Sequence, residues 1–290
     1  MQASMKLHDL AARLDREFNV AGHPENLTDF AVVDDNRALV NPSFLERHTA
    51  LMLQGNEEVQ GVICVVFVTD AIVELLSARR NCLLFTHHHF DYHEDERGLE
   101  PIRSGQLDSL VGQGHSLYVA HAPLDVHPVY GTSRTLTALA GVPPEEEFFE
   151  YFGSSVGVMG RIAAVGFEEY AEKVRMAIER PCVTRVNYRG SVEKVAVVAG
   201  GGDLPEVLEE AARAGCDTLV TGTVEHRWNI PFAQDNNRRF HDLNRRLRLN
   251  LVGGTHYGTE RPAMMAVTRM FREWQVPAHF MEDDSLLHAL

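Results

Sequence analysis

Three consecutive histidines, His87, His88 and His89, follow an apolar run, residues 83–85, and the single residue Thr86. A short apolar run of this kind predicts a buried strand whose C-terminal end opens into a loop. Open α/β sheets place their ligands at that edge. Because imidazole is the commonest metal-ligating side chain, the run predicts a metal site. Taken alone, the segment is equally compatible with a solvated His-rich loop.

A second polar group follows the next strand along the chain. Residues 115–120 predict a strand, and His121 and Asp125 come directly after it. Pro123 lies between them and disfavours a continuous helix, so we expect both side chains on a turn. Again the polar residues begin where the strand ends.

An internal repeat with a constant offset of 135 residues relates the two halves of the chain. The pairs at this offset are Thr86 and Thr221, His121 and His256, and Asp125 and Glu260. A constant offset at polar, loop-placed positions predicts a duplicated α/β unit whose strand ends face a common cleft. With a boundary near the acidic run 145–147, the expected lobes are residues 1–145 and 146–290.

The repeat would gather many metal-binding side chains at that cleft. They are His87, His88, His121, Asp125, His256 and Glu260, with Glu225, His226 and His93 nearby. Imidazole and carboxylate groups are typical ligands of divalent transition metals. One catalytic ion uses about three protein ligands and keeps a position open, so this set is large enough for two ions roughly 3.5–4 Å apart. For any single histidine the alternative is a hydrogen-bonded structural role.

Strands and helices alternate along most of the chain. Strands are predicted at residues 62–68, 83–86, 115–120, 160–166, 182–186, 195–198, 217–220 and 249–252, and helices at residues 5–18, 102–112, 132–140, 167–179, 205–214 and 235–247. Thr69 and Thr259 are expected to cap two further helices, with Pro262 in the first turn of the second. The apolar strands predict a parallel sheet covered on both faces. Residues 19–58 and the tail from Pro277 give no clear pattern.

Charge and cysteine content exclude several classes of protein. The net charge of −14 argues against binding to nucleic acid. The arginines that could oppose this, Arg238, Arg239, Arg245, Arg246 and Arg248, have the spacing of an exposed helical face. The four cysteines are far apart and lie among apolar residues, so no disulfide framework is expected. No secretory signal or membrane-spanning run is visible, and we expect a cytoplasmic protein.

A glycine-rich turn, Gly200-Gly201-Gly202, precedes a predicted helix. Such a turn can cradle a phosphate on helix N–H groups. Because Pro205 occupies the third glycine position of G-x-G-x-x-G, the dinucleotide motif is absent, and a tight turn is the preferred interpretation. No organic cofactor is predicted.

Four motifs together resemble those of the Nif-three-like dinuclear metal-centre family, the GTP cyclohydrolase 1 type 2-like proteins. They are Thr86-His87-His88, His121-Ala122-Pro123-Leu124-Asp125, Thr221-Gly222-Thr223 and Thr255-His256-Tyr257-Gly258-Thr259-Glu260. The resemblance covers most of residues 60–274, and its last motif is the most specific. It implies a two-lobed α/β fold, two divalent ions per chain (Zn, Fe or Mn), and toroidal homohexamers built from dimers.

The resemblance also implies roles for individual residues. The metal ligands would be His87, His88, Asp125, His256 and Glu260, with Glu260 bridging the ions. His121 would lie close to the metals as a supporting or acid–base group. The sequence departs from the family pattern at His89, where proline is usual, at Thr223, where an acid is usual, and in residues 19–58, where a Trp-Asp-Asn-x-Gly-Leu segment is missing.

Three functions fit these observations. The first is a metal-dependent hydrolase acting on a small heterocyclic amide or amidine, a purine-like ring or a phosphoester, with His121, His226 or Glu225 transferring the proton. The second is a protein that handles a metal or metallocofactor without turnover; His89 and His93 fit a metal relay and a substrate-binding rim equally. The third is a scaffold whose metals only join the lobes.

Overall fold

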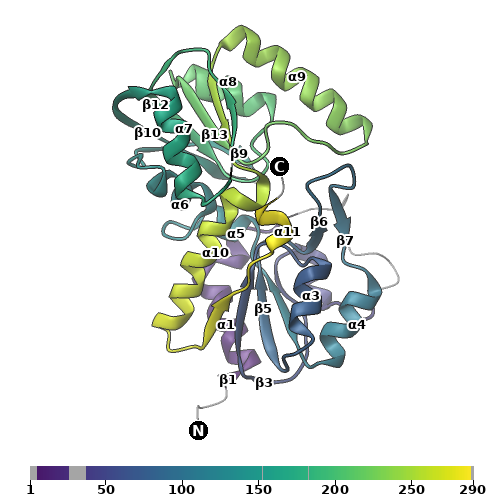
Figure 1. The fold of residues 1–290 in the computed structure, drawn as a ribbon. Helices are drawn as coiled ribbons and strands as arrows, with labels where there is room; N and C mark the ends of the chain where they lie inside the picture. Colours follow the sequence, from purple (N-terminus) through teal and green to yellow (C-terminus); the bar gives the residue numbers. More distant parts are fainter. Residues whose placement is uncertain (1–4, 26–36, 152, 182, 289–290) are drawn as a thin grey trace. The chain divides into compact units, whose positions relative to one another are not determined.

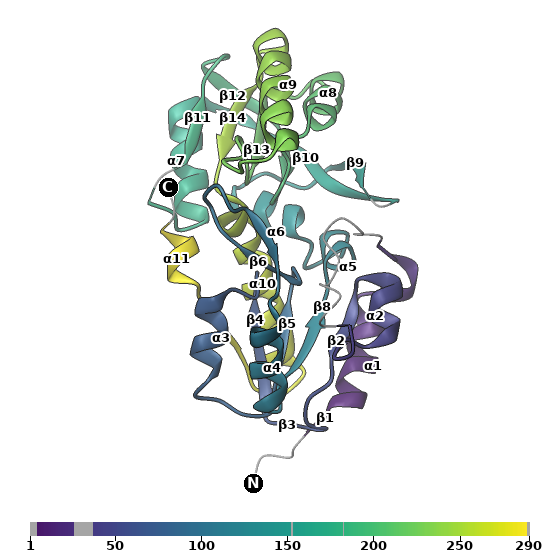
Figure 2. The same cartoon turned by 90° about the vertical axis from the view of Figure 1, so that its right-hand side faces the viewer.

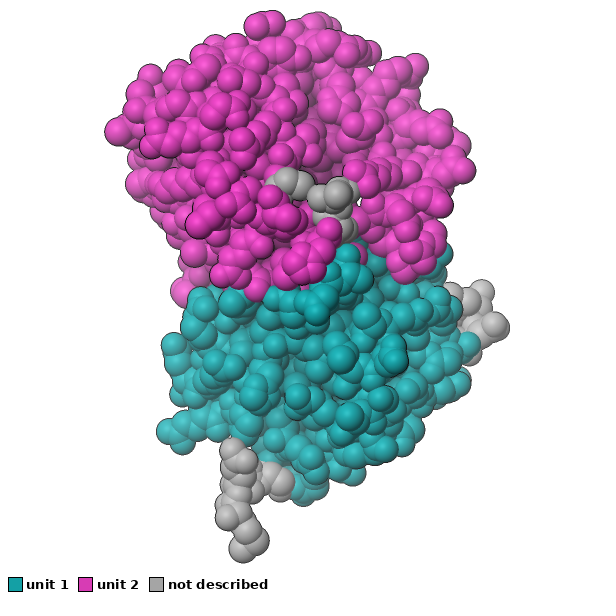
Figure 3. Space-filling view, in the orientation of Figure 1, with its two compact units in different colours: residues 1–92, 99–127, 264–285 teal, residues 93–98, 128–263, 286–290 magenta. Residues whose placement is uncertain are grey.

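The computed structural model describes residues 5–25, 37–151, 153–181 and 183–288 (Figure 1). The chain divides into two compact units (Figure 3). Unit 1 comprises residues 1–92, 99–127 and 264–285, and unit 2 comprises residues 93–98, 128–263 and 286–290. Each unit contains a mixed β-sheet with helices, so the protein is an α/β protein.

Unit 1 is built on a five-stranded sheet. Its order is β15 (Ala278–Phe280), β4 (Gly61–Val65), β5 (Cys82–Thr86), β8 (Ser116–Val119) and β2 (Ala50–Leu53). The first four strands run parallel, and β2 pairs antiparallel with β8 at one edge. The strand–helix–strand unit expected before the histidines is therefore confirmed, with β4 and β5 as its parallel strands.

Helices cover both faces of this sheet (Figures 1 and 2). One face carries α3 (Asp70–Leu76) and α4 (Ser104–Gly112), and the other carries α1 (Leu7–Glu17) and the second part of α10 (His256–Glu273). Along β5, Leu84 belongs to the core on the α3 side, whereas the Phe85 ring lies 5.4 Å from Phe18 and 5.5 Å from Phe271. Because both faces are buried, β5 is apolar throughout.

Unit 2 is built on a six-stranded sheet. Its order is β11 (Thr184–Val186), β14 (Asn250–Gly253), β13 (Thr218–Thr221), β12 (Ser191–Val198), β10 (Ser154–Gly166) and β9 (Glu146–Tyr151). The three central strands β14, β13 and β12 run parallel, and the outer strands pair antiparallel with their neighbours. The expected parallel character therefore holds only for the centre of the sheet.

Helices α6 (Thr132–Leu139) and α7 (Phe167–Ala177) cover one face of this second sheet, and α8 (Pro205–Arg213) and α9 (Pro231–Leu247) cover the other (Figures 1 and 2). The core on the α7 side joins Tyr170 and Val174 to Val197 and Val220. The five arginines of 238–248 are exposed, as their spacing predicted.

Short elements complete the described chain. They are β1 (Met5–Lys6), η1 (Val20–Gly22), α2 (Pro42–Arg47), β3 (Glu58–Val59), β6 (Phe90–Tyr92), β7 (Leu99–Pro101), α5 (Ala122–Asp125) and α11 (Asp284–Leu287). Cys64, Cys82 and Cys216 are buried free thiols, whereas Cys182 lies outside the described residues. No helix of the described chain has the length and apolar character needed to cross a membrane.

Two expectations about local structure were wrong. The acidic run 145–147 is not a solvated connection: residues 146–151 form the edge strand β9, whose Phe148 and Phe149 are buried while the charged residues face outward. Residues 122–125 form the one-turn helix α5, preceded by His121, rather than an open turn. Pro123 fits there because the N–H that it lacks belongs to the first turn, where no helical partner exists.

The start of α10 also differs from expectation. The helix begins at His256 and not after Thr259, so Pro262 lies inside it. Thr255 takes the capping role, because its Oγ1 accepts the N–H of Gly258 at 3.1 Å. Thr69 does cap α3, accepting the N–H of Ile72 at 3.3 Å. The earlier start places His256 and Glu260 one turn apart in the same helix.

Candidate metal centre

The C-terminal end of β5 is locked by hydrogen bonds that direct the histidines out of the sheet. The hydroxyl of Thr86 lies 2.7 Å from the carbonyl oxygen of His88 and 3.1 Å from that of Val66. The N–H of His88 donates to the same Val66 carbonyl at 2.9 Å. These bonds close a tight turn, so His87 and His88 leave the sheet at the carboxyl edge of its strands.

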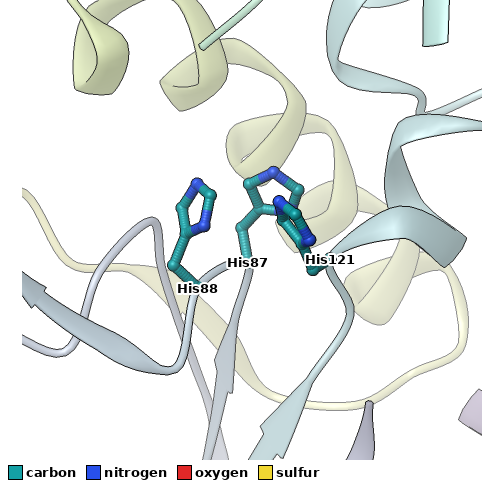
Figure 4. Close-up of side chains that lie close together, drawn as sticks. All are labelled: His87, His88 and His121. Atoms are coloured by element: carbon teal, nitrogen blue, oxygen red, sulfur yellow. The ribbon is translucent and has the colours of Figure 1, made fainter. Parts of the chain in front are cut away.

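Three imidazoles of unit 1 meet at this edge (Figure 4). The ring centroids are 4.3 Å apart for His87 and His88, 4.9 Å for His87 and His121, and 4.8 Å for His88 and His121. Each residue offers a ring nitrogen, and these nitrogens lie within 4.8 Å of one another. His87 and His88 are buried. The separation is short enough for one ion to bind all three.

Asp125 lies beside two of these rings. Its Oδ1 is 3.5 Å from Nε2 of His87, and its Oδ2 is 4.0 Å from Nε2 of His121. Nδ1 of His87 lies 2.9 Å from the carbonyl oxygen of Ala120, which can only accept, so this nitrogen carries the proton in the neutral ring. The lone pair of His87 is then on Nε2, the nitrogen nearest Asp125.

Glu25 is a site residue that the sequence did not reveal. Its Oε2 lies 2.6 Å from Nδ1 of His121, and its Oε1 accepts the N–H of Ala122 at 2.7 Å. The carboxylate is buried, with 3% of the residue exposed. Burial disfavours the imidazolium of His121, but the charge and hydrogen bond of Glu25 outweigh it and raise the pKa of His121 above its ordinary value.

The neighbouring aromatic side chains separate His88 from His89. The His88 ring stacks on Phe67 at 4.4 Å with an interplanar angle of 8°. His89 packs instead against Phe44, edge to face at 5.2 Å, and lies parallel to His48 at 6.1 Å. Burial lowers the pKa of His89 well below its ordinary value. His89 thus belongs to the packing of unit 1, and His93 lies in the 93–98 segment of unit 2.

Unit 2 contributes a buried imidazole–carboxylate pair. Nε2 of His256 lies 3.0 Å from Oε1 of Glu260, within the first turns of α10. Thr255, directly before this pair, has φ of +65°, a left-handed conformation that β-branched residues rarely adopt. Backbone strain of this kind persists where the surrounding structure enforces it, and it is often found at functional sites.

Gly200 leaves room for this pair. Its φ is +68°, and a Cβ added to it would lie 2.1 Å from Oε1 of Glu260 and 2.9 Å from Nε2 of His256. Its N–H donates to Oγ1 of Thr259 at 2.9 Å, and its carbonyl accepts the N–H of Thr223, also at 2.9 Å. The glycine-rich segment therefore packs directly against His256 and Glu260.

A second buried acid–histidine pair follows that turn. Oδ2 of Asp203 lies 2.9 Å from Nε2 of His226. Asn236 donates from Nδ2 to this same oxygen and to the Asp203 carbonyl, both at 3.0 Å. The next residue, Asn237, bonds the backbone N–H and carbonyl of His226 at 2.9 and 2.7 Å. Glu225, the other candidate in this loop, is exposed.

Within each unit, the structure brings together most of the residues selected from the sequence. Unit 1 gathers His87, His88, His121 and Asp125, and unit 2 pairs His256 with Glu260. Glu25 and Asp203 were missed. Glu25 lies in the segment without periodicity, whereas Asp203 directly follows the glycine-rich turn and could have been noted as a buried acid after a strand.

The donor set fits a divalent transition-metal ion. The imidazoles of His87 and His121 each direct Nδ1 to an oxygen acceptor and Nε2 toward the carboxylate of Asp125. Metal-ligating histidines characteristically bond their second nitrogen to a carbonyl or a carboxylate in this way. Burying carboxylates and imidazoles that have no hydrogen-bond partner or metal ion would cost free energy of desolvation.

Comparison with known proteins agrees with this site. Residues 48–285 match the family model Duf34/NIF3 (NGG1p interacting factor 3). The GTP cyclohydrolase 1 type 2 homolog of Pyrococcus abyssi is 30% identical over 232 residues, covering 77% of this chain and 84% of the relative. The homolog of Archaeoglobus fulgidus is 30% identical over 211 residues, covering 72% and 79%.

A solved structure has the same fold. Protein ybgI, described as of unknown function, superposes with a TM-score of 0.74 at 21% identity, covering 97% of this chain and all of the other. The motifs, the buried histidine cluster and these matches lead to one conclusion: this chain belongs to the Duf34/NIF3 family, the family of the GTP cyclohydrolase 1 type 2 homologs.

Proposed function

We propose that this protein is a divalent-metal-dependent hydrolase of the cyclohydrolase or amidohydrolase type, acting on a small heterocyclic or nucleotide-like substrate. The observation that carries the proposal is the cluster of His87, His88 and His121, three imidazoles within reach of one ion at the carboxyl edge of the parallel strands of unit 1. α/β proteins bind their ligands at that edge. Three imidazoles with an open position are a common catalytic metal site.

The ligands proposed for the two ions are those that the family resemblance implies. They are His87, His88 and Asp125 of unit 1 and His256 and Glu260 of unit 2. Supporting this set, all but Asp125 are buried, and both carboxylates lie beside imidazole nitrogens. Zn, Fe and Mn all accept such donors. When bound, ions of this kind acidify a water molecule and polarise the scissile bond.

We assign proton transfer to His226 rather than to His121 or Glu225. Oδ2 of Asp203, which can only accept, lies 2.9 Å from Nε2 of His226, so a neutral ring protonated at Nε2 has its lone pair on Nδ1. Among the described residues Nδ1 of His226 has no hydrogen-bond partner. A buried carboxylate behind an imidazole fixes its tautomer and its orientation, as in acid–base catalysis. Glu225 is exposed and lacks such support, and His121 belongs to the imidazole cluster.

We also infer that the two sheets derive from one duplicated α/β unit. Each contains three neighbouring parallel strands, β4-β5-β8 in unit 1 and β12-β13-β14 in unit 2. The N–H of His88 donates to Val66, and the N–H of Thr223, 135 residues later, donates to Gly200, both at 2.9 Å. A bond of the same kind at the corresponding strand ends supports a common origin, although the two acceptors are offset by one residue from the repeat.

The test measures metal content and turnover in the same preparations. Untagged protein should contain about two transition-metal ions per chain by mass spectrometry, and a panel of cyclic amides, amidines, purines and phosphoesters should include a substrate. His226→Gln should lower kcat about 10²- to 10⁴-fold while leaving metal content unchanged. A protein that binds and exchanges metal but hydrolyses nothing in the panel would instead support the metal-handling function.

Assembly into homohexamers, implied by the resemblance, is proposed as well. Size-exclusion chromatography with light scattering would give the mass of the assembly directly. A monomeric mass at working concentration would contradict hexamer formation, with no consequence for the metal site of unit 1.

A further inference from the structure

Glu25 is held in place through both its backbone and its buried carboxylate. Its backbone N–H donates at 3.1 Å to the carbonyl of Arg47, the last residue of α2. Its two oxygens are both used, one by Nδ1 of His121 and the other by the N–H of Ala122. The carboxylate is thus fixed to the first residues of α5. With Nδ1 of His121 engaged, the ring can offer only Nε2 to a ligand.

His121 therefore presents the same nitrogen as His87. Nε2 of each ring faces one oxygen of Asp125, at 4.0 Å for His121 and 3.5 Å for His87. Nδ1 of each ring bonds an oxygen on the far side, a carboxylate for His121 and a carbonyl for His87. A carboxylate behind a histidine orients the ring and raises its basicity toward a metal.

We propose that His121 is a metal ligand positioned by Glu25, and that unit 1 alone binds one divalent ion through His87, His88 and His121. The ion belongs to the borderline class that favours imidazole, of which Zn²⁺ is the best probe. This inference rests on the proposed function only for its premise that the centre binds a divalent metal. It requires neither turnover nor any ligand from unit 2.

A second acid–histidine pair of unit 1 provides a comparison for the Glu25–His121 pair. Oε1 of Glu17 lies 3.6 Å from Nε2 of His127, a ring outside the imidazole cluster. The side chain of Glu17 is 35% exposed, whereas that of Glu25 is fully buried. Removing the charge of Glu17 should therefore leave metal binding unchanged. Glu17→Gln is the matched control for Glu25→Gln.

The experiment titrates Zn²⁺ into metal-stripped full-length protein against a chromophoric chelator. In the double variant His256→Ala/Glu260→Ala, about one Zn²⁺ per chain should remain tightly bound. Adding Glu25→Gln should weaken that ion about 10- to 100-fold, and adding Glu17→Gln should not. With Co²⁺ as a second probe, the visible absorption bands should change with Glu25→Gln and stay unchanged with Glu17→Gln.

Two results would overturn the inference: a double variant that binds no Zn²⁺, or a Glu25→Gln variant with unchanged affinity and Co²⁺ spectrum. Circular dichroism checks folding. If Glu25→Gln does not fold, Glu25→Asp, which keeps the charge but withdraws it by one methylene, should show the weakened binding instead. Absence of hydrolysis with Zn²⁺ still bound would refute the proposed reaction and leave this inference standing.

Discussion

Gly200 provides the sharpest test of how unit 2 supports its imidazole–carboxylate pair. A Cβ at this position would approach Oε1 of Glu260 to 2.1 Å and Nε2 of His256 to 2.9 Å, closer than van der Waals contact allows. Gly200→Ala must therefore displace the Glu260 carboxylate and disturb the 3.0 Å contact between the pair. The substitution also places alanine at φ of +68°, which costs about 1–2 kcal/mol.

Gly215→Ala measures the cost of the positive φ alone in the free energy of unfolding. Gly215 also lies in unit 2, its φ is +76°, and no atom lies within 4 Å of an added Cβ. We expect Gly215→Ala to lower the free energy of unfolding by about 1–2 kcal/mol. Gly200→Ala should lose about 1–3 kcal/mol more, the usual cost of leaving buried polar groups unpaired.

Guanidinium unfolding of the metal-free proteins, followed by far-ultraviolet circular dichroism, measures both losses. Metal-free protein is needed because bound ions would add their own stabilisation. Metal content of the separately loaded proteins gives the second measurement: Gly200→Ala should lose the ion that depends on Glu260, and Gly215→Ala should lose none. Equal stability losses and equal metal content in the two variants would refute the steric argument.

Two further predictions concern buried titratable groups. Burial lowers the pKa of His115, whose Nδ1 accepts the Cys82 N–H at 3.1 Å. Below the ordinary pKa of histidine, the unfolded chain therefore binds more protons at this residue than the folded chain does. Stability should be complete above about pH 6.5 and fall below it, by up to about 1.4 kcal/mol per pH unit for this group. The stability difference between wild type and His115→Asn, measured by unfolding at pH 7.5 and 5.5, should therefore shrink at the lower pH; a constant difference would contradict the assignment. Burial likewise raises the pKa of Cys64 to about 12 and that of Cys216 to about 11, so iodoacetamide at pH 8 should label both only after unfolding. Peptide mass mapping measures this, and rapid native labelling of Cys64 would disprove it.

The residues that could be predicted from the sequence are those whose positions follow from local structure. A buried strand such as β5 determines where its last residue lies, so His87 and His88 could be assigned to the sheet edge from the pattern alone. His256 and Glu260 could be selected from the 135-residue offset, although the helix that holds both was expected to begin later. The error at Thr259 arose because Thr255, whose φ is positive, also offers a capping hydroxyl, and local propensity does not distinguish the two.

Glu25 and β9 could not be predicted, for two different reasons. Glu25 is 96 residues from His121 in the sequence, in a segment without periodicity, and only the tertiary fold brings its carboxylate to that ring. The edge strand β9 was not predicted because the acidic residues 145–147 are typical of a loop. Within β9 only Phe148 and Phe149 are buried, and charged side chains are tolerated at a sheet edge. Composition favoured a loop, and pairing with β10 determined the strand.

The proposed duplication explains why similar backbones carry different chemistry. The hydrogen bond made by the N–H of His88 recurs at Thr223, but the side chain there is a hydroxyl instead of an imidazole. Unit 1 therefore collects three imidazoles, whereas unit 2 retains a single imidazole–carboxylate pair in α10. Unit 2 also has the Asp203–His226 pair, formed by the loops that follow β12 and β13. Unit 1 thus holds the candidate ion site, and unit 2 holds the pair proposed for proton transfer. On this reasoning, Asp203→Asn should impair turnover without weakening the ion of unit 1, and Glu25→Gln should weaken binding of that ion while leaving the Asp203–His226 pair intact.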